Sequence, residues 1–539
     1  MKTVRSMVLV SSDPESQKRG SADIYAAFER LLNQYGLTEE IQLTYASDIG
    51  NSAAVPLVMV YPEAVIYGPL QVSEVPRIVE EHLFKGRIVE DKLAPRYNLS
   101  GHVAWLQARK GTLPAENRVV LKNVGIIDPD SIDDYVVQDG YQALGLALNM
   151  KPEEVLKTVS DSGLQGRGGA GFPTGLKWSF VRKAAGAKKY VICNADESEP
   201  GTFKDRVILE GDPHRTIEAM LIAGYAVGAD EGFIYIRGEY QLALQRLEAA
   251  IKQAEAYGFL GENIFGSGFS FHMHVHAGAG AYICGEETAL IESLEGKRGE
   301  PRSRPPYPTT EGLWGKPTLI NNVETLANIP PIIRNGAEWY RKMGTASSPG
   351  TKVCTILGNV HEKGLIEVPM GITLREIITI YAKGMKDGNF KMAQTGGSGG
   401  SIIPSSLQDT PMDFESYRKA GVSLGSGALL ICNDSVCIVD LAIVLTNFFR
   451  VECCGKCTPC RIGTKRAHDL LIGISKGQGK MEDLAELENL GHDLIALSNC
   501  GLGQTAGTPL KDMFNYFRAE VEAHVKLGIC PCGICQMHD

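Results

Sequence analysis

Four cysteines near the C-terminus constrain this chain more than any other feature of its sequence. Cys454, Cys457 and Cys460 form a C-x2-C-x2-C motif, and Cys500 follows further along. Two-residue spacings bring successive thiolates onto one inorganic cluster, which a distant fourth cysteine completes in 4Fe-4S centres. A zinc site is the alternative, but zinc sites of this kind usually pair two C-x2-C motifs. The spacing therefore favours a 4Fe-4S cluster, with Cys453 offering a competing register.

The rest of the sequence predicts a reducing compartment for these thiols. The first residues, Met1 to Ser12, contain only a short apolar run, which does not make a secretion signal. Acidic and amide side chains interrupt the most apolar long segment, 429–450, so we expect no direct membrane insertion. A cytoplasmic protein keeps its thiols reduced, so the 13 cysteines are better metal ligands than disulfides. The formal net charge of −9 argues against nucleic acid as a partner.

The last residues of the chain form a second cluster of metal-ligating side chains. Cys530, Cys532, Cys535 and His538 lie within nine positions of one another and could bind zinc tetrahedrally. A second iron-sulfur cluster completed by another subunit is one alternative, and a tail without metal is the other.

Hydrophobic patterning predicts an α/β multidomain protein. Short β-rich runs such as 190–193 alternate with helical segments such as 215–228, as in a central sheet flanked by helices. Apolar residues at helical spacing over 435–525 predict a helical bundle. The expected parts are an α/β domain (1–95), a linker (96–139), the sheet domain (140–348), a small α+β module (349–430), the helical domain (431–526) and the cysteine-rich tail (527–539).

A glycine-rich segment, 163–178, precedes an expected helix in the sheet domain. Its glycines permit close approach of backbone N–H groups to a phosphate, and Arg167 and Lys177 would supply positive charge. The order Gly-x-Gly-Gly-x-Gly differs from the dinucleotide-binding fingerprint, and no clear strand ends directly before it. Taken alone, this segment also fits a tight structural loop.

Three further segments change that balance: 193–201 (CNADESEPG), 278–288 (GAGAYICGEET) and 321–325 (NNVET). Together with the glycine segment and the cysteine motif, they closely resemble the flavin- and NADH-binding subunit of respiratory complex I. The same resemblance extends to soluble relatives in NAD-dependent formate dehydrogenases, multi-subunit hydrogenases and NADH:ferredoxin oxidoreductases. It covers about residues 140 to 525, which includes the cluster motif.

The resemblance implies FMN, NAD(H) and one 4Fe-4S cluster as cofactors, with zinc at the tail as an additional expectation. It implies FMN contacts at Gly166, Arg167, Gly168, Gly169, Lys177, Asn194, Asp196, Glu197, Tyr282, Gly285, Glu286, Glu287, Asn321, Asn322 and Thr325. It implies NADH contacts at Phe172, Phe180, Glu197, Glu199, Glu287, Arg304 and Tyr307. Carboxylates that accept the ribose hydroxyls and repel a 2′-phosphate favour NAD(H) over NADP(H). Because the flavin carries the chemistry, no acid/base residue is expected.

The first domain resembles the thioredoxin-like ferredoxin that binds a 2Fe-2S cluster in related proteins. Where that family has its ligand cysteines, this chain has Ser11, Ser16, Asp48 and Ser52. No thiolate remains to hold iron, so we expect a docking surface here and the second cluster on a partner subunit. Residues 349–430 resemble the family's ubiquitin-like (SLBB-type) module.

These features together predict a diaphorase subunit of a soluble multi-subunit oxidoreductase. NADH gives a hydride to FMN, and single electrons pass through the 4Fe-4S cluster to partner subunits. The expected partners are a thioredoxin-like 2Fe-2S subunit and a further iron-sulfur electron-transfer or catalytic subunit; ferredoxin as a partner, and electron bifurcation with it, stay open. The alternatives are the NADH-binding subunit of membrane respiratory complex I and a non-catalytic iron-sulfur scaffold.

Overall fold

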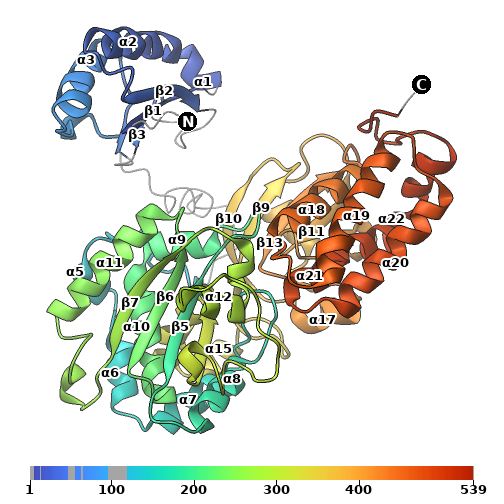
Figure 1. Cartoon of the computed structure of the whole chain (residues 1–539). Helices are drawn as coiled ribbons and strands as arrows, with labels where there is room; N and C mark the ends of the chain where they lie inside the picture. The colour runs from blue at the N-terminus through green and yellow to red at the C-terminus, as the bar shows by residue number, and fades with distance from the viewer. Residues whose placement is uncertain (1–4, 13, 47–54, 62–64, 95–117, 538–539) are drawn as a thin grey trace. The chain divides into compact units, whose positions relative to one another are not determined.

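The chain folds into two compact units, which are residues 1–101 and 102–539 (Figure 1). The computed structural model describes residues 5–12, 14–46, 55–61, 65–94 and 118–537. Each unit is described by itself.

Unit 1 is a four-stranded sheet with helices, as the apolar runs of the first domain predicted. The strand order is β2-β1-β3-β4, in which β1 pairs in parallel with β2 and antiparallel with β3, and β3 pairs antiparallel with β4. Buried residues such as Val8, Phe28 and Ile78 form its core. The elements are β1 (Ser6–Ser11), α1 (Pro14–Lys18), α2 (Ser21–Gln34), β2 (Ile41–Ala46), β3 (Val58–Tyr61), β4 (Val65–Tyr67) and α3 (Val75–Ile78), which continues as a π-helical turn over Val79–Phe84.

Unit 2 contains a four-stranded parallel sheet in the order β7-β6-β5-β8. Helices cover both faces, since Ile192 and Tyr235 pack with Leu290 of α12, while Gly232, on the opposite face, lies against Met220 of α10. The strands are β5 (Tyr190–Ala195), β6 (Glu231–Arg237), β7 (His272–Gly278) and β8 (Thr318–Asn322). The helices are α5 (Ile132–Val137), α6 (Gln142–Leu148), α7 (Pro152–Asp161), α8 (Thr174–Lys183), α9 (Lys204–Gly211), α10 (Pro213–Val227), α11 (Gln241–Ala256), α12 (Glu287–Leu294), α13 (Val323–Ala327), α14 (Ile329–Asn335) and α15 (Ala337–Arg341).

A second sheet of unit 2 has five strands in the order β10-β9-β13-β11-β12. Only the β13–β9 pair is parallel. The sheet encloses its own buried core, which includes Ile356, Leu374 and Tyr417. Its elements are β9 (Thr351–Gly358), β10 (Gly364–Pro369), α16 (Leu374–Glu376) with a π-helical turn over Ile377–Tyr381, β11 (Phe390–Thr395), β12 (Ile402–Pro404), α17 (Phe414–Lys419) and β13 (Ala428–Asn433).

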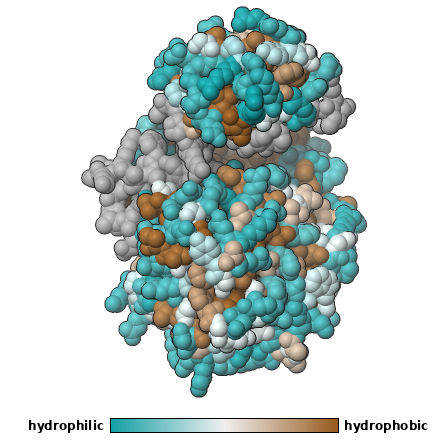
Figure 2. Space-filling view, turned by 90° about the vertical axis from the view of Figure 1, so that its left-hand side faces the viewer, coloured by the Kyte–Doolittle hydropathy of each residue, from teal (hydrophilic) through white to brown (hydrophobic). Residues whose placement is uncertain are grey.

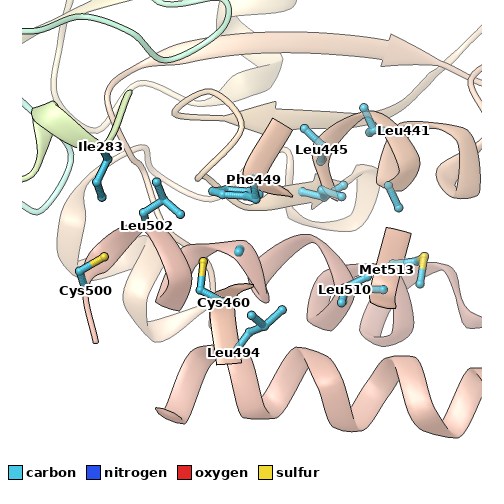
Figure 3. Packing of buried hydrophobic residues seen from close by; sticks show 14 of the residues in the cluster. Ile283, Leu441, Leu445, Phe449, Cys460, Leu494, Cys500, Leu502, Leu510 and Met513 are labelled. Carbon is cyan, nitrogen blue, oxygen red and sulfur yellow. The ribbon is translucent and has the colours of Figure 1, made fainter. Parts of the chain in front are cut away.

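The C-terminal part of unit 2 is helical, as the apolar spacing predicted. Its helices share one buried core with the parallel sheet, and Figure 3 shows Ile283, Leu502 and Cys500 gathered at one end of this core with Cys460 next to them. The helices are α18 (Ile438–Glu452), α19 (Thr458–Ser475), α20 (Met481–Leu497), α21 (Gly501–Ala506) and α22 (Thr508–Lys526).

On the face drawn in Figure 2, apolar residues are scattered among hydrophilic ones. Within the part of the chain that the structure describes, no helix has both the length and the apolar character needed to cross a bilayer.

Candidate functional site

A cavity of about 420 Å³ lies at the carboxyl ends of the parallel strands of unit 2. Asn194 lies near the end of strand β5, Asp196 follows that strand directly, and Asn322 ends β8. In open parallel sheets, ligands bind in the crevice beyond the carboxyl ends of the strands. The volume is within the range of small-molecule sites. Fold and cavity thus place the ligand site where the two asparagine segments of the sequence meet.

The other walls of the cavity come from distant parts of unit 2. The loop after β11 contributes Gly396 and Gly399, and the loop before β13 contributes Gly425. Gly501 and Leu502, the first residues of α21, line it from the helical part. Sequence patterning did not predict these walls, because only tertiary packing brings three separate segments together.

The glycine segment presents bare backbone to the cavity at Gly168 and Gly169. A Cβ at Gly168 would lie 3.1 Å from the Cβ of Asn322, so a side chain there would crowd the wall. We expected the Arg167 side chain to supply charge to a phosphate, but its guanidinium is fully buried and donates to Thr351 O, Pro349 O and Tyr340 Oη. Arg167 therefore braces the loop from behind.

Lys177, the second expected cation, forms an ion pair with Glu287 and donates to Ile320 O at 3.1 Å. Two other predicted residues support the same region: Thr325 Oγ1 accepts from the Arg167 backbone N–H at 2.8 Å, and Asn321 Oδ1 accepts from Trp178 Nε1 at 2.9 Å. These side chains position the glycine loop and helix α8.

The structure brings ten of the predicted site residues to the cavity wall and leaves ten outside it. Those on the wall are Gly168, Gly169, Asn194, Asp196, Glu197, Glu199, Tyr282, Gly285, Glu286 and Asn322. Those not on it are Gly166, Arg167, Phe172, Lys177, Phe180, Glu287, Arg304, Tyr307, Asn321 and Thr325. The wall residues that the sequence did not predict are Ala170, Ser198, Thr202, Lys204, Asp205, Ile283, Gly396, Gly399, Ser423, Gly425, Ser426, Gly501, Leu502 and Thr505.

The aromatic residues predicted for NADH lie exposed outside the cavity wall. Phe172, Phe180 and Tyr307 are 43%, 44% and 56% exposed. Exposed rings of this size are uncommon on soluble proteins without a partner, and a flat ring can stack on a planar ligand. Arg304 forms an ion pair with Glu286 at 3.2 Å. Their roles in nucleotide binding stay predictions.

Three carboxylates at the cavity are held protonated more readily than usual. Burial raises the pKa of Asp196, Glu197 and Glu199 to about 7 each, even though hydrogen bonds oppose the shift. Glu199 accepts from Tyr282 Oη at 2.7 Å and from the Gly399 N–H at 2.6 Å. Glu197 caps helix α9 by accepting from the backbone N–H groups of Asp205 and Arg206.

Replacing Glu199 with glutamine is expected to flatten the pH dependence of stability in the flavin-free protein. The folded pKa of about 7 lies above the usual 4.5, so the folded state retains a proton that the unfolded chain releases. Stability therefore falls as pH rises from about 4.5 through 7, and Glu199→Gln removes that share. Denaturant unfolding at several pH values from 5 to 8 measures the slope.

Glu239→Gln is the matched control for this prediction. Its hydrogen bond to Arg237 holds the pKa of Glu239 below the usual value, so it does not titrate between pH 5 and 8. An equal slope in Glu199→Gln and the unmodified protein would contradict the prediction.

A buried ion network supports the cavity from below. Lys204 Nζ lies 2.7 Å from Asp205 Oδ1 and 3.0 Å from Glu324 Oε2, and Asn322 Nδ2 donates to Asp205 Oδ2 at 2.7 Å. Lys352 Nζ completes the network at 2.6 Å from Glu324 Oε2. Burial lowers the pKa of Lys204, but its two carboxylate neighbours outweigh burial and raise that pKa overall. Because Lys204 and Asp205 also line the cavity, the network couples folding to ligand binding.

The four cysteines of the predicted cluster converge next to this cavity. Cys457 is the N-cap of α19, Cys460 lies in its first turn, and Cys500 is the N-cap of α21. Cys460 interacts electrostatically with Cys457 and Cys500, and Cys500 with Cys454. Two helix N-termini thus face a thiolate-rich centre, which favours its negative charge. Gly501 and Leu502, directly after Cys500, line the cavity, so cluster and cavity are neighbours.

Cys453, the competing ligand, also lies close to this centre. A hydrogen bond with Cys460 lowers the pKa of Cys453 to about 6, and the Gly455 N–H donates to Cys453 Sγ at 3.3 Å.

At the tail, the structure changes the predicted metal-ligating set. The side chains that come together are Cys437, His524, Cys530 and Cys535. Cys532 lies apart, because its Sγ is 3.5 Å from Lys391 Nζ, and His538 lies outside the described residues. Sequence spacing could not reveal this set, since Cys437 and His524 lie at the ends of two different helices.

Of the four positions aligned with 2Fe-2S ligands in unit 1, Ser11 and Ser16 are buried. Ser11 Oγ accepts from the Leu57 N–H at 2.9 Å, so the hydroxyl serves the fold. Asp48 and Ser52 lie outside the described residues.

Comparison with known families identifies the class of protein that this fold and site define. Residues 159–331 match the Nuo51 FMN-binding domain, and residues 440–524 match the NADH-ubiquinone oxidoreductase-F iron-sulfur binding region. The first match contains the glycine loop and the parallel sheet, and the second contains all four cluster cysteines. The chain is therefore an FMN-binding flavoprotein with a 4Fe-4S region.

Similar proteins refine that class. The chain is 50% identical over 419 residues to the NADP-reducing hydrogenase subunit HndC of Solidesulfovibrio fructosivorans (78% of this chain, 85% of the relative). It is 48% identical over 415 residues to a flavoprotein-type component of the NADH-quinone oxidoreductase of Rhizobium meliloti (strain 1021), covering 77% of this chain and 99% of the relative. An air-oxidized NAD+-reducing [NiFe]-hydrogenase structure matches with a TM-score of 0.68 at 31% identity, over 97% of this chain and 86% of that one. The chain belongs to the Nuo51-type family of NADH-quinone oxidoreductase subunits, which includes such hydrogenase subunits.

The cavity fits the FMN that the family binds. Bare backbone at Gly168 and Gly169 lets N–H groups approach a phosphate, and the amides of Asn194 and Asn322 offer donors and acceptors to the polar edge of a ring. The cysteine set likewise fits a 4Fe-4S cluster, with three ligands in one short segment and a fourth at a separate helix start.

Proposed function

We propose that the chain is the diaphorase subunit of a soluble multi-subunit oxidoreductase, which exchanges a hydride with NAD(H) and passes single electrons to partner subunits. The observation that carries the proposal is the shared wall between cavity and cluster, because Gly501 and Leu502 line the cavity and directly follow Cys500. Bound FMN supplies the conversion between two-electron and one-electron transfer. Everything else is positioning by this chain.

The site residues would divide that positioning between them. Gly168, Gly169 and the asparagines would hold the flavin against the sheet edge, and Phe172, Phe180 and Tyr307 would stack on the nucleotide. Glu197 and Glu199 would accept ribose hydroxyls, which favours NADH over NADPH. The wall residue Leu502 would keep water from the path between flavin and cluster.

The likeness to hydrogenase subunits supports a hydrogenase-type complex, and the likeness to NADH-quinone oxidoreductase subunits supports the respiratory alternative. In either complex we propose iron-sulfur subunits as the electron-transfer partners. Unit 1, whose strand order supports the predicted thioredoxin-like fold, would dock such a subunit without holding iron. The domain boundaries predicted from the sequence are part of this proposal.

An anaerobic titration of the purified complex with NADH tests the proposed function. Flavin absorbance is expected to bleach with NADH, followed by reduction of the cluster, and kcat/KM is expected to be about tenfold or more higher for NADH than for NADPH. Phe180→Ala should raise the KM for NADH at unchanged flavin content, whereas Phe265→Ala, an equally exposed ring outside the site, should not.

Other outcomes of the same experiment identify the alternatives. Flavin that does not respond to NADH, or iron without flavin, would establish the scaffold. Co-purification with membrane subunits would assign the chain to a respiratory complex. Bifurcation requires that NADH oxidation by the complex depend on ferredoxin together with a second acceptor.

A further inference from the structure

A second group of metal-ligating side chains lies in the helical part, outside the flavin cavity. The Sγ atoms of Cys437, Cys530 and Cys535 and a ring nitrogen of His524 all lie within 4.8 Å of one another. Among the described residues, no other three cysteine, histidine or acidic side chains are grouped as a candidate metal site. Cys437 is the N-cap of α18, His524 lies in the last turn of α22, and the other two belong to the tail (Figure 1). Three segments therefore converge on one point.

The distances within this group match those imposed by a single tetrahedral ion. Cys437 Sγ lies 3.7 Å from Cys535 Sγ and 3.4 Å from His524 Nε2. A zinc ion bound at about 2.3 Å to sulfur and about 2.0–2.1 Å to nitrogen separates its ligand atoms by about 3.8 Å (S to S) and about 3.6 Å (S to N). A 4Fe-4S cluster holds cysteine sulfurs further apart, because iron and sulfide lie between them. The geometry therefore favours a mononuclear site.

His524 is oriented as a metal ligand. Its Nδ1 lies 2.8 Å from the Glu520 carbonyl oxygen, which can only accept, so Nδ1 carries the hydrogen. The lone pair of Nε2 then points to the sulfur atoms. Metal-binding histidines are usually fixed in this way by a carbonyl or carboxylate on the other nitrogen. Both His524 and Cys437 are buried, which leaves little room for water as a competing ligand.

Cys532 is excluded from the group by its own partners. Its Sγ lies 3.5 Å from Lys391 Nζ and 3.6 Å from Glu520 Oε1, and Lys391 is in turn paired with Glu520 at 2.7 Å. The tight turn through Gly533, which has a left-handed φ of 68° and whose N–H donates to Cys530 O, directs Cys530 and Cys535 to the same side.

We propose that Cys437, His524, Cys530 and Cys535 bind one Zn²⁺ as a structural site. Three thiolates and an imidazole form a complete tetrahedral set with no open position, which is the arrangement of structural zinc. The ion ties the tail and the end of α22 to the start of α18. At its other end, α18 leads directly to the cluster cysteines, about 22 Å away for a helix of 15 residues. Zinc has no redox chemistry, so this site holds the cluster-bearing helix without relaying electrons.

Metal analysis and zinc-edge X-ray absorption of the unmodified complex test the proposal directly. One zinc per chain is expected, with three sulfur ligands at about 2.3 Å and one nitrogen at about 2.0–2.1 Å. A four-sulfur shell would overturn the ligand set by admitting Cys532. Iron in place of zinc, or no metal beyond the 4Fe-4S iron, would overturn the proposal itself. This measurement needs no variant and does not depend on the flavin reaction.

Matched variants then assign the ligands. Cys437→Ser and Cys535→Ser are expected to lose zinc at unchanged FMN content, whereas Cys532→Ser, in the same tail, retains it. Substitution with Co²⁺ gives a second readout, since a tetrahedral thiolate site absorbs strongly in the visible range and the Cys437→Ser site would not. Zinc retained in Cys437→Ser but lost in Cys532→Ser would contradict the assignment.

Discussion

Cys454→Ala is expected to remove the 4Fe-4S cluster, lowering the iron content by about four per chain. Three remaining thiolates at Cys457, Cys460 and Cys500 leave one iron without its protein ligand. Flavin bleaching by NADH should persist, because Cys454 does not line the cavity. Electron transfer to one-electron acceptors through the partner subunits should be lost. Iron analysis and the electron paramagnetic resonance spectrum of the reduced protein provide the readout.

Cys453→Ala is the control that makes this result decisive. The two cysteines are adjacent, and Cys453 lies beside Cys460, so both registers are sterically open. The two-residue spacing assigns Cys454 as the ligand, in which case Cys453→Ala keeps its iron. Iron loss in Cys453→Ala with iron retained in Cys454→Ala would reverse the register. Loss in both would mean that Cys453 supports the cluster without being replaceable.

The elements of this fold were largely predictable from local patterns. Alternating and helically spaced apolar residues predicted β1, β5, β6 and β7 and the helices α10, α11 and α20 to within a few residues, because each buries one face. The short strand β8 was not predicted. It is a central member of the site, but its five residues end in two asparagines, which is a weak strand pattern.

The site was predictable only where a residue acts through its own chemistry. The cluster cysteines and the asparagines at the ends of β5 and β8 carry their function in their side-chain type. Arg167 was expected to face a phosphate, but its burial among carbonyl oxygens depends on strand β9, far away in the sequence. Gly425 and Leu502 line the cavity because of tertiary packing alone. Lys204 was missed for the same reason, since its partner Glu324 is distant along the chain.

Lys204→Met is expected to destabilise the flavin-free protein by about 3–5 kcal/mol, the usual effect of removing one partner from a buried ion pair. Asp205 and Glu324 are both buried, and Lys204 neutralises both. Methionine has a similar length and fills the space, so the loss reports charge rather than volume. Flavin content should fall as well, because Lys204, Asp205 and Asn322 form one wall of the cavity.

Lys188→Met separates this burial effect from the loss of any lysine. Lys188 also bridges two carboxylates, Asp230 and Glu231, at 2.8 and 2.6 Å, but its side chain is 34% exposed. Water screens that pair, so its loss should cost no more than about 1 kcal/mol. Urea unfolding of both variants gives the comparison. Equal losses would mean that the Lys204 network is solvated in solution, and the coupling between this network and flavin binding would then fall with it.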